Sequence, residues 1–426
     1  MSQASESQQI VERKPDDPHR GVAAARNGLL LLVIAYLGFI SLGLPDPVAG
    51  VAWPSVREHF GLHQNRFGLV FIALGCGYCL SGFFGGTLTR VLGLGNLLWV
   101  SSALVAVAML GSGLTPAWAL FVGCGVIWGL GSGGIDAGLN AYVSKHFSAR
   151  HMNWLHACYS LGATLGPLLM TAMLVRLGSW RLGYGVVGGI LLAMSLLFLV
   201  TRQRWDDPPK SDSGADPSGV DGEQRPTAAA EQGIGMRQVM ADRLVWFHVA
   251  LFFFYVGLEF TVGQWCFSLL TESRGVPTNV AGMLASAYYG AIGVGRILSG
   301  VIAPRVGLDP LLRGTMGIAL VGAVVYAFAS PVWLSSAGLV LIGLGLAPVF
   351  PCLMSKTPER LGAESAAHAV GFQVSAGMLG AALVPGLAGL LVERMGLEFV
   401  TRVSLTLAIL LVTTHEILLR LPSRRN

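Results

Sequence analysis

Twelve stretches of mostly apolar residues, each long enough to cross a lipid bilayer, follow one another along the chain. A helix needs about 20 such residues to span the hydrocarbon core. The stretches are too long for barrel strands and lack the alternation of a barrel, so only helices are plausible spans. The sequence therefore predicts an all-α polytopic membrane protein with twelve transmembrane helices, at residues 27–55, 66–89, 93–113, 116–143, 153–176, 181–201, 244–271, 279–303, 308–329, 332–355, 366–392 and 396–420.

Charged residues are scarce and gather between these stretches. They make up 12% of the chain, against roughly 25% in an ordinary soluble domain. If the N-terminus is cytoplasmic, the tails and the even-numbered connections hold most of the Lys and Arg residues. The positive-inside rule then predicts that both termini are cytoplasmic. We expect a multi-pass protein of a plasma membrane, such as the bacterial inner membrane, and the net charge of +5 is explained by loops beside lipid, without a nucleic-acid partner.

A polar segment separates the sixth stretch from the seventh. Residues 202–243 carry Asp, Pro, Ser and Gly in quick succession and have too little apolar surface to fold, apart from a short interfacial helix expected at 234–243. The first 26 residues lack the apolar core of a signal peptide. The predicted organisation is a cytoplasmic tail (1–26), a six-helix bundle (27–201), a cytoplasmic linker (202–243), a second six-helix bundle (244–420) and a cytoplasmic tail (421–426).

The two halves echo each other in sequence. Gly86-Thr-Leu-Thr-Arg-Val-Leu-Gly93 follows the second stretch, and Gly300-Val-Ile-Ala-Pro-Arg-Val-Gly307 follows the eighth at the same relative place. Gly129-Leu-Gly131 and Gly343-Leu-Gly345 repeat with the same offset. An internal repeat of this kind predicts two six-helix bundles related by pseudo-two-fold symmetry.

These features together resemble the major facilitator superfamily, and three segments, 131–141, 156–167 and 255–265, are similar to its fucose permease branch. The resemblance implies the major facilitator fold and proton-coupled sugar uptake, with one acid in helix one and another in helix four. Asp46 and Asp136 stand at those places. It also implies gating arginines in the two glycine-rich loops, where Arg90 and Arg305 stand.

Three carboxylates lie deep within apolar stretches, namely Asp46, Asp136 and Glu259. A charged side chain in the bilayer core costs several kcal/mol, and such residues usually mark a pathway for ions or substrates. Asp46 stands between two prolines that break the helix ladder and free carbonyl groups beside the carboxylate. We predict proton-coupling roles for all three acids. The alternative for Asp46 is a cap on a helix end at the outer interface.

Polar and aromatic residues accompany these acids along the helices. A sugar offers hydroxyl groups around its edge and apolar C–H faces that stack on aromatic rings, so a sugar site needs both kinds of side chain. Packing, interhelical polar contacts or the interfacial aromatic belt are the alternatives. Arg296 in the eighth stretch is a further gating candidate. The predicted substrate-binding residues are Asn140, His156, Tyr159, Tyr255, Gln264, Trp265 and Gln373.

Two motifs that suggest other functions are better explained by helix packing. The G-x-G-x-x-G spacing at 129–134 has no preceding strand, so it does not indicate a nucleotide site. Cys76 and Cys79 have redox spacing, but all six cysteines lie in apolar stretches, and we predict no disulfide and no metal. Neither H-E-x-x-H nor a Ser/His constellation occurs at a credible depth, so we expect no enzyme activity and no cofactor.

The sequence thus predicts a monomeric secondary active transporter that takes up a hexose or deoxyhexose with protons by alternating access. Its partners would be the small-molecule substrate, protons and the lipid bilayer. Two alternatives remain open. One is an exporter of drugs or other small organic solutes, and the other is a membrane sensor that binds a ligand without transporting it.

Overall fold

The computed structural model of the chain describes residues 18–205 and 239–422. The described part is almost entirely helical and contains no strand. Residues 1–17, 206–238 and 423–426 lie outside it, and with them most of both predicted tails, most of the predicted linker and half of the helix expected at 234–243. We call residues 18–205 the N-terminal half and residues 239–422 the C-terminal half.

Each half holds the helices that the sequence predicts. In the N-terminal half these are α1 (Pro18–Gly43), α2 (Val48–Phe60), α3 (Phe67–Leu92) after the 3-10 turn η1 (Gln64–Arg66), α4 (Leu94–Leu114), α5 (Trp118–His146), α6 (Ala149–Leu177) and α7 (Trp180–Thr201), followed by η2 (Arg202–Arg204). The C-terminal half has α9 (Arg243–Ser268) with the π-helical turn η4 (Leu269–Ser273), α10 (Thr278–Val306), α11 (Leu308–Phe328), α12 (Val332–Leu346), α13 (Val349–Leu361), α14 (Ala363–Met395) and α15 (Phe399–Arg420).

All twelve predicted stretches are helical. The first is divided into α1 and α2 at residues 44–47, as the two prolines predict, and the tenth is divided into α12 and α13 beside Pro348. Eleven described helices are long and apolar enough to cross a membrane. The exception is α10, which is long enough but carries Arg296 and is rich in Gly, Ser and Tyr. Several helices extend past the predicted limits, because the apolar count misses their polar ends.

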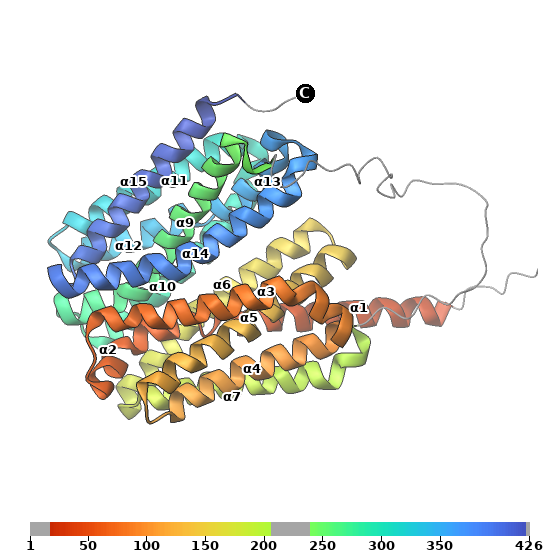
Figure 1. The fold of residues 1–426 in the computed structure, drawn as a ribbon, viewed down its shortest axis with the longest axis horizontal. Helices are drawn as coiled ribbons and strands as arrows, with labels where there is room; N and C mark the ends of the chain where they lie inside the picture. The colour runs from red at the N-terminus through yellow and green to blue at the C-terminus, as the bar shows by residue number, and fades with distance from the viewer. Residues whose placement is uncertain (1–17, 206–238, 423–426) are drawn as a thin grey trace, which may run out of the picture.

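The two halves lie side by side as separate bundles (Figure 1). We call the end where α7 stops and α9 starts the linker end, and the end with η1 and η4 the far end. The helix axes of the two halves diverge toward the linker end (Figure 1). The halves meet along a seam where α3 packs on α14, α6 on α10 and α2 on α9.

Glycine makes close helix approach possible, both in the seam and within each half. In the seam, a Cβ built on Gly68 would lie 2.8 Å from the Cα of Gly386. Within the N-terminal half, Gly129 of α5 faces α3, and Gly131 and Gly134 face α4. No side chain fits at these positions, since the nearest atoms belong to the neighbouring helix. The packing explanation of the G-x-G-x-x-G spacing is therefore confirmed. All six cysteines are free.

Candidate functional site

Asp46 lies in the break between α1 and α2, where its carboxylate is half-buried. The Tyr159 hydroxyl of α6 donates a hydrogen bond of 2.5 Å to Asp46 Oδ2. From the other half, Gln264 Nε2 of α9 donates to the backbone carbonyl of Asp46 at 2.8 Å. The break thus places an acid in the middle of the seam, in reach of both halves.

Glycines set the position of Tyr159 relative to the break. Gly43 of α1 lies against the Tyr159 carbonyl, and Gly162 and Gly166 of α6 lie against the backbone of Ile40 and Leu44. A Cβ at any of the three would collide with main-chain atoms. The small residues therefore let α1 and α6 approach closely enough for the Tyr159 hydroxyl to reach Asp46.

Asp136 lies in the second half of α5 and is also half-buried. Tyr78 of α3 donates a hydrogen bond of 2.5 Å to Asp136 Oδ2. Asn140, one helical turn after Asp136, donates to Oδ1 at 2.9 Å, in line with the predicted shared face. Helix α1, which ends at the break that holds Asp46, packs on α5. The N-terminal half therefore holds two acids whose identified hydrogen-bond donors are neutral hydroxyl and amide groups.

Glu259 of α9 has a different environment. It is 8% exposed, and its Oε1 lies 3.9 Å from Arg296 Nη2 of α10. Arg296 Nη1 donates to the Ser160 hydroxyl of α6 at 2.9 Å, across the seam. Tyr255 is buried beside both charges. The acid of the C-terminal half is therefore compensated by a permanent cation, and that cation also contacts the other half.

Three other predicted binding residues have different surroundings. Trp265 is fully buried, donates to the Pro385 carbonyl at 3.1 Å and packs on Phe67. Gln373 is fully buried and exchanges hydrogen bonds with Thr357 of α13. His156 is half-buried, with its ring edge on Phe39. Trp265 and Gln373 thus contribute to helix contacts in this conformation, and His156 makes no hydrogen bond to Asp136.

The far end of the seam is closed by polar contacts between the halves. Arg57 of α2 pairs with Glu272 of η4 at 3.0 Å, and Gln64 Nε2 donates to the same carboxylate at 2.9 Å. The backbone N–H of Gln64 donates to Glu393 Oε2 of α14 at 2.9 Å, and His63 Nδ1 lies 2.8 Å from Glu393 Oε1. Four polar contacts therefore join the two halves beyond the acids.

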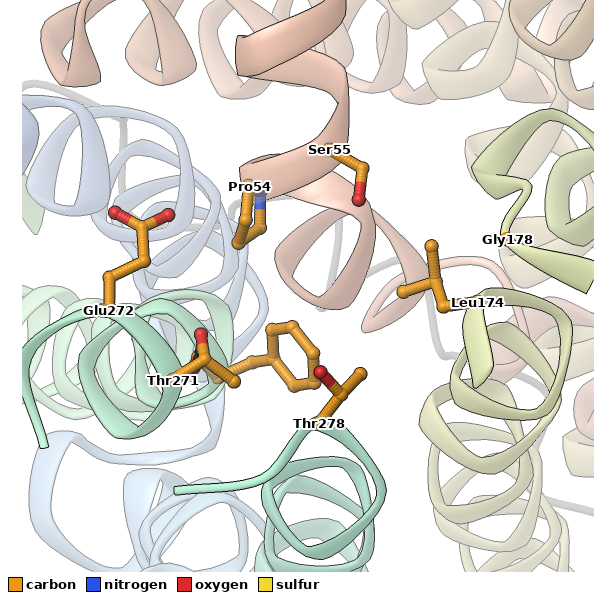
Figure 2. Close-up of a pocket in the computed structure, with 8 residues that line it drawn as sticks. Pro54, Ser55, Leu174, Gly178, Thr271, Glu272 and Thr278 are labelled. Carbon is orange, nitrogen blue, oxygen red and sulfur yellow. Dashed lines mark hydrogen bonds between the residues drawn. The ribbon is translucent and has the colours of Figure 1, made fainter. Parts of the chain in front are cut away.

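A cavity of about 310 Å³ lies in the seam at this closed end. Pro54 and Ser55 of α2, with Leu174 and Gly178 at the end of α6, form one wall, and residues of α9, η4 and α10 form the other. Figure 2 shows the Ser55 and Thr278 hydroxyls turned toward the space between the helices. The cavity thus lies between the two halves, at the far end of the seam.

The two arginines of the glycine-rich loops lie at the linker end. Arg90 lies in the last turn of α3 and Arg305 in the last turn of α10, and both side chains are exposed. They stand on corresponding helices of the two halves, as the internal repeat predicts. No group of three or more His, Cys, Asp or Glu side chains suited to a metal ion occurs in residues 18–205 and 239–422.

Two residues of this site escape the sequence reasoning, Tyr78 and Ser160. Tyr78 stands in an apolar run and looks like a packing residue, and Ser160 follows Tyr159 without any distinguishing pattern. The only signal in the sequence was that Tyr78 and Asp136 both lie in the middle part of their helices, α3 and α5. Predicting their hydrogen bond also requires knowing that α3 and α5 are neighbours.

A sequence model of the Major Facilitator Superfamily matches residues 29–385 of the chain. The glucose/mannose transporter GlcP of Bacillus subtilis is 22% identical over 330 residues, which cover 76% of this chain and 78% of the relative. The sodium-dependent glucose transporter 1A of Mus musculus is 24% identical over 409 residues, covering 84% and 88%.

Among solved structures, the fucose:proton symporter FucP of E. coli aligns with a TM-score of 0.60 at 16% identity, over 91% of this chain and 98% of that one. At this identity the likeness shows the fold. It agrees with the predicted arrangement of twelve helices in two bundles.

Proposed function

Because the chain belongs to the Major Facilitator Superfamily and is a membrane transporter, we propose that it takes up a hexose or deoxyhexose together with protons by alternating access. Membership of the family also identifies it as a transporter rather than an enzyme. The substrate class, the coupling ion and the direction of transport are the proposal.

The observation that carries the proposal is the pair of half-buried acids, Asp46 and Asp136, held by neutral donors. Ionised carboxylates without a cation are costly inside a membrane bundle. Protonation removes that charge and leaves no buried cation unpaired. Two such acids, of which Asp46 lies in the seam, therefore suit a cycle in which a proton binds before the halves change position.

Sugar recognition is supported by the groups around the acids. Asn140, Tyr159 and Gln264 offer hydroxyl and amide groups, and Arg296 and Glu259 offer charged donors and acceptors. Two relatives whose names state glucose transport cover most of the chain, which supports a monosaccharide. His156 and Tyr255 complete the proposed surroundings of the substrate.

With both termini in the cytoplasm of a plasma membrane, the linker end faces inward. The contacts at the far end and the divergence of the helices toward the linker end then support an inward-facing conformation (Figure 1). In the opposite conformation the contacts of Arg57 and Gln64 with the C-terminal half break. Arg90 and Arg305 are then proposed to approach the opposite half as gating residues.

The test is sugar-dependent proton movement in proteoliposomes. Purified protein is reconstituted, a panel of hexoses and deoxyhexoses is added outside, and external pH is followed with and without an uncoupler. The proposal expects external alkalinisation with one or a few sugars, abolished by the uncoupler. Sugar uptake that requires sodium and moves no protons would replace proton coupling with sodium coupling. Absence of uptake with every sugar, with dye efflux from loaded vesicles, would overturn the proposal in favour of export.

A further inference from the structure

Asp136 is held on both of its oxygens, and one of its two donors comes from a different helix. Asn140 belongs to α5, as Asp136 does, whereas Tyr78 belongs to α3. The Tyr78 hydroxyl lies 2.5 Å from Oδ2, a distance typical of a strong hydrogen bond to a carboxyl group. Asn140 alone leaves the carboxyl group free to rotate, and the second donor fixes its direction.

The backbone of α3 is fixed against α5 around Tyr78. Gly77 lies against the Val126 carbonyl, and Gly129 lies against the Leu74 carbonyl, so the two helices approach without intervening side chains. Beyond them, Gly133 faces Ser81, where a built Cβ would be 2.9 Å from the Ser81 Cβ. Packing of this kind leaves little freedom for a slide of α3 along α5. It therefore holds the Tyr78 hydroxyl at a constant distance from Asp136.

The same helix also borders the seam between the halves. Gly68 of α3 faces Gly386 of α14, and a Cβ built on Gly75 would lie 2.7 Å from the Ala382 Cβ of α14. Tyr78 is less than one turn beyond Gly75. The hydrogen bond from Tyr78 thus connects Asp136 to the helix that contacts the C-terminal half.

We propose that Tyr78 is a positioning residue for Asp136, which aims the carboxyl group and ties its protonation to α3 and the seam. This role rests on the proposed function, in which Asp136 carries a coupling proton. When Asp136 is ionised, its two oxygens accept from Tyr78 and Asn140. When a proton binds, one oxygen becomes a donor, and the strength of the contact between α5 and α3 changes.

A purely structural tie between α3 and α5 is the competing explanation. Such a tie would lower stability when removed, but the folded variant would keep the maximal rate of proton-driven uptake of the wild type. Loss of a positioning residue lowers that rate even in the folded protein. Infrared spectroscopy shows in addition whether Tyr78 contacts the protonated carboxyl group, because a hydrogen bond to a carboxyl group lowers its C=O stretching frequency.

The experiment measures infrared difference spectra of the reconstituted full chain between high and low pH. The Asp136 band is identified as the carboxyl band that is missing in Asp136→Asn. It is then followed in Tyr78→Phe, which removes the hydroxyl group alone, and in Tyr184→Phe, a matched control at a buried tyrosine of α7. Tyr78→Met, with a flexible helix-forming side chain, serves if Tyr78→Phe does not fold.

We expect the Asp136 band to move to higher frequency in Tyr78→Phe and to stay unchanged in Tyr184→Phe. Proton-driven uptake by Tyr78→Phe should fall about tenfold in maximal rate, the effect of one lost hydrogen bond to a charged group, with little change in KM. An unshifted Asp136 band in the folded variant would overturn the positioning role. A shifted band in a protein that moves no protons would retain the positioning role and reject proton coupling instead.

Discussion

The two halves share a fold but treat their buried acids differently. In the N-terminal half, Asp46 and Asp136 accept hydrogen bonds from Tyr159, Tyr78 and Asn140. In the C-terminal half, Glu259 faces the Arg296 guanidinium. A neutral donor tolerates both charge states of an acid, whereas an arginine loses its counter-ion when the acid is protonated. From this difference we propose that proton exchange belongs to the N-terminal half and that Glu259 carries a fixed charge, in place of the proton-coupling role that the sequence predicts for it.

The largest effect should come from removing charge in the N-terminal half. Asp136→Asn keeps the size of the side chain but is permanently neutral, so accumulation of sugar against its gradient should fall to equilibration. Exchange of labelled for unlabelled sugar should continue, because it needs no change of protonation. Accumulation and exchange are measured in the same proteoliposomes, with Asp46→Asn beside them. Glu259→Gln, which keeps a hydrogen-bonding side chain at the proposed sugar site, is the matched control. The proposed difference between the halves is contradicted if this variant alone abolishes accumulation.

A second large effect concerns the charge pair of the C-terminal half. Arg296→Met should destabilise the protein by about 3–5 kcal/mol, because Glu259 is then buried without a counter-ion. The double variant Glu259→Gln/Arg296→Met should recover most of this loss. Thermal unfolding of the wild type, both single variants and the double variant gives the coupling energy. Additive losses would show that the two charges do not interact, despite the distance of 3.9 Å.

A smaller effect is expected at the far end of the seam. Side chains of Arg57 and Glu272 are 30% and 24% exposed, so their pair contributes about 1 kcal/mol at most. Glu272→Gln should therefore shift the population toward the outward-facing conformation by no more than about fivefold. Spin labels on Val91→Cys and Val306→Cys, in a variant without native cysteines, report the separation at the linker end. Their distance should shorten in Glu272→Gln, and a lengthened distance would contradict the assignment.

The smallest effect is a pH dependence of stability, which we expect from an ion pair of the C-terminal half. Hydrogen bonds from Arg274 hold the pKa of Glu398, in the α14–α15 loop, below its ordinary value. The stabilisation is present above the unfolded pKa near 4.5 and is lost as pH falls through the lower folded value. Because Glu398 is 46% exposed, we expect at most about 0.5 kcal/mol.

Thermal melts at pH 7 and pH 4 test this dependence. Glu398→Gln should lose stability at pH 7 and differ less from the wild type at pH 4. In the N-terminal half, the Ser195 hydroxyl of α7 donates to the Trp99 carbonyl of α4 at 2.9 Å, and neither group titrates between these pH values. Ser195→Ala should therefore cost similar stability at both pH values. If the stability loss of both variants depended equally on pH, this predicted difference between the halves would be wrong.

The helices could be predicted well from the sequence, because a chain that crosses lipid must satisfy its backbone hydrogen bonds internally and few structures do so. Apolar length defines each span, and Pro45 and Pro47 dictate the break beside Asp46. The acids were also found, since charge is rare in these stretches. Their partners were found only where they lie one turn away, as Asn140 does from Asp136. Tyr78 and Ser160 act across helix contacts, and which helices are neighbours is set by glycine packing that sequence spacing alone does not reveal.

The same limitation applies to two predicted substrate residues, whose binding roles stay predictions. Trp265 and Gln373 have the chemistry of sugar-binding residues. In this conformation each is fully buried and hydrogen-bonded within the C-terminal half, and Trp265 also packs on Phe67 across the seam. Helix rotation decides whether a side chain faces the seam or a neighbouring helix. With a mostly apolar surface on every side, these helices give little amphipathic signal from which to read that rotation.

Proton uptake on substrate binding tests the division between the halves most directly. Purified wild type, Asp136→Asn, Asp46→Asn and Glu259→Gln are titrated with the transported sugar in weakly buffered detergent solution containing a pH indicator. We predict that the wild type and Glu259→Gln take up protons on binding and that one or both aspartate variants bind sugar without doing so. Proton uptake that persists in both aspartate variants and disappears in Glu259→Gln would contradict the account.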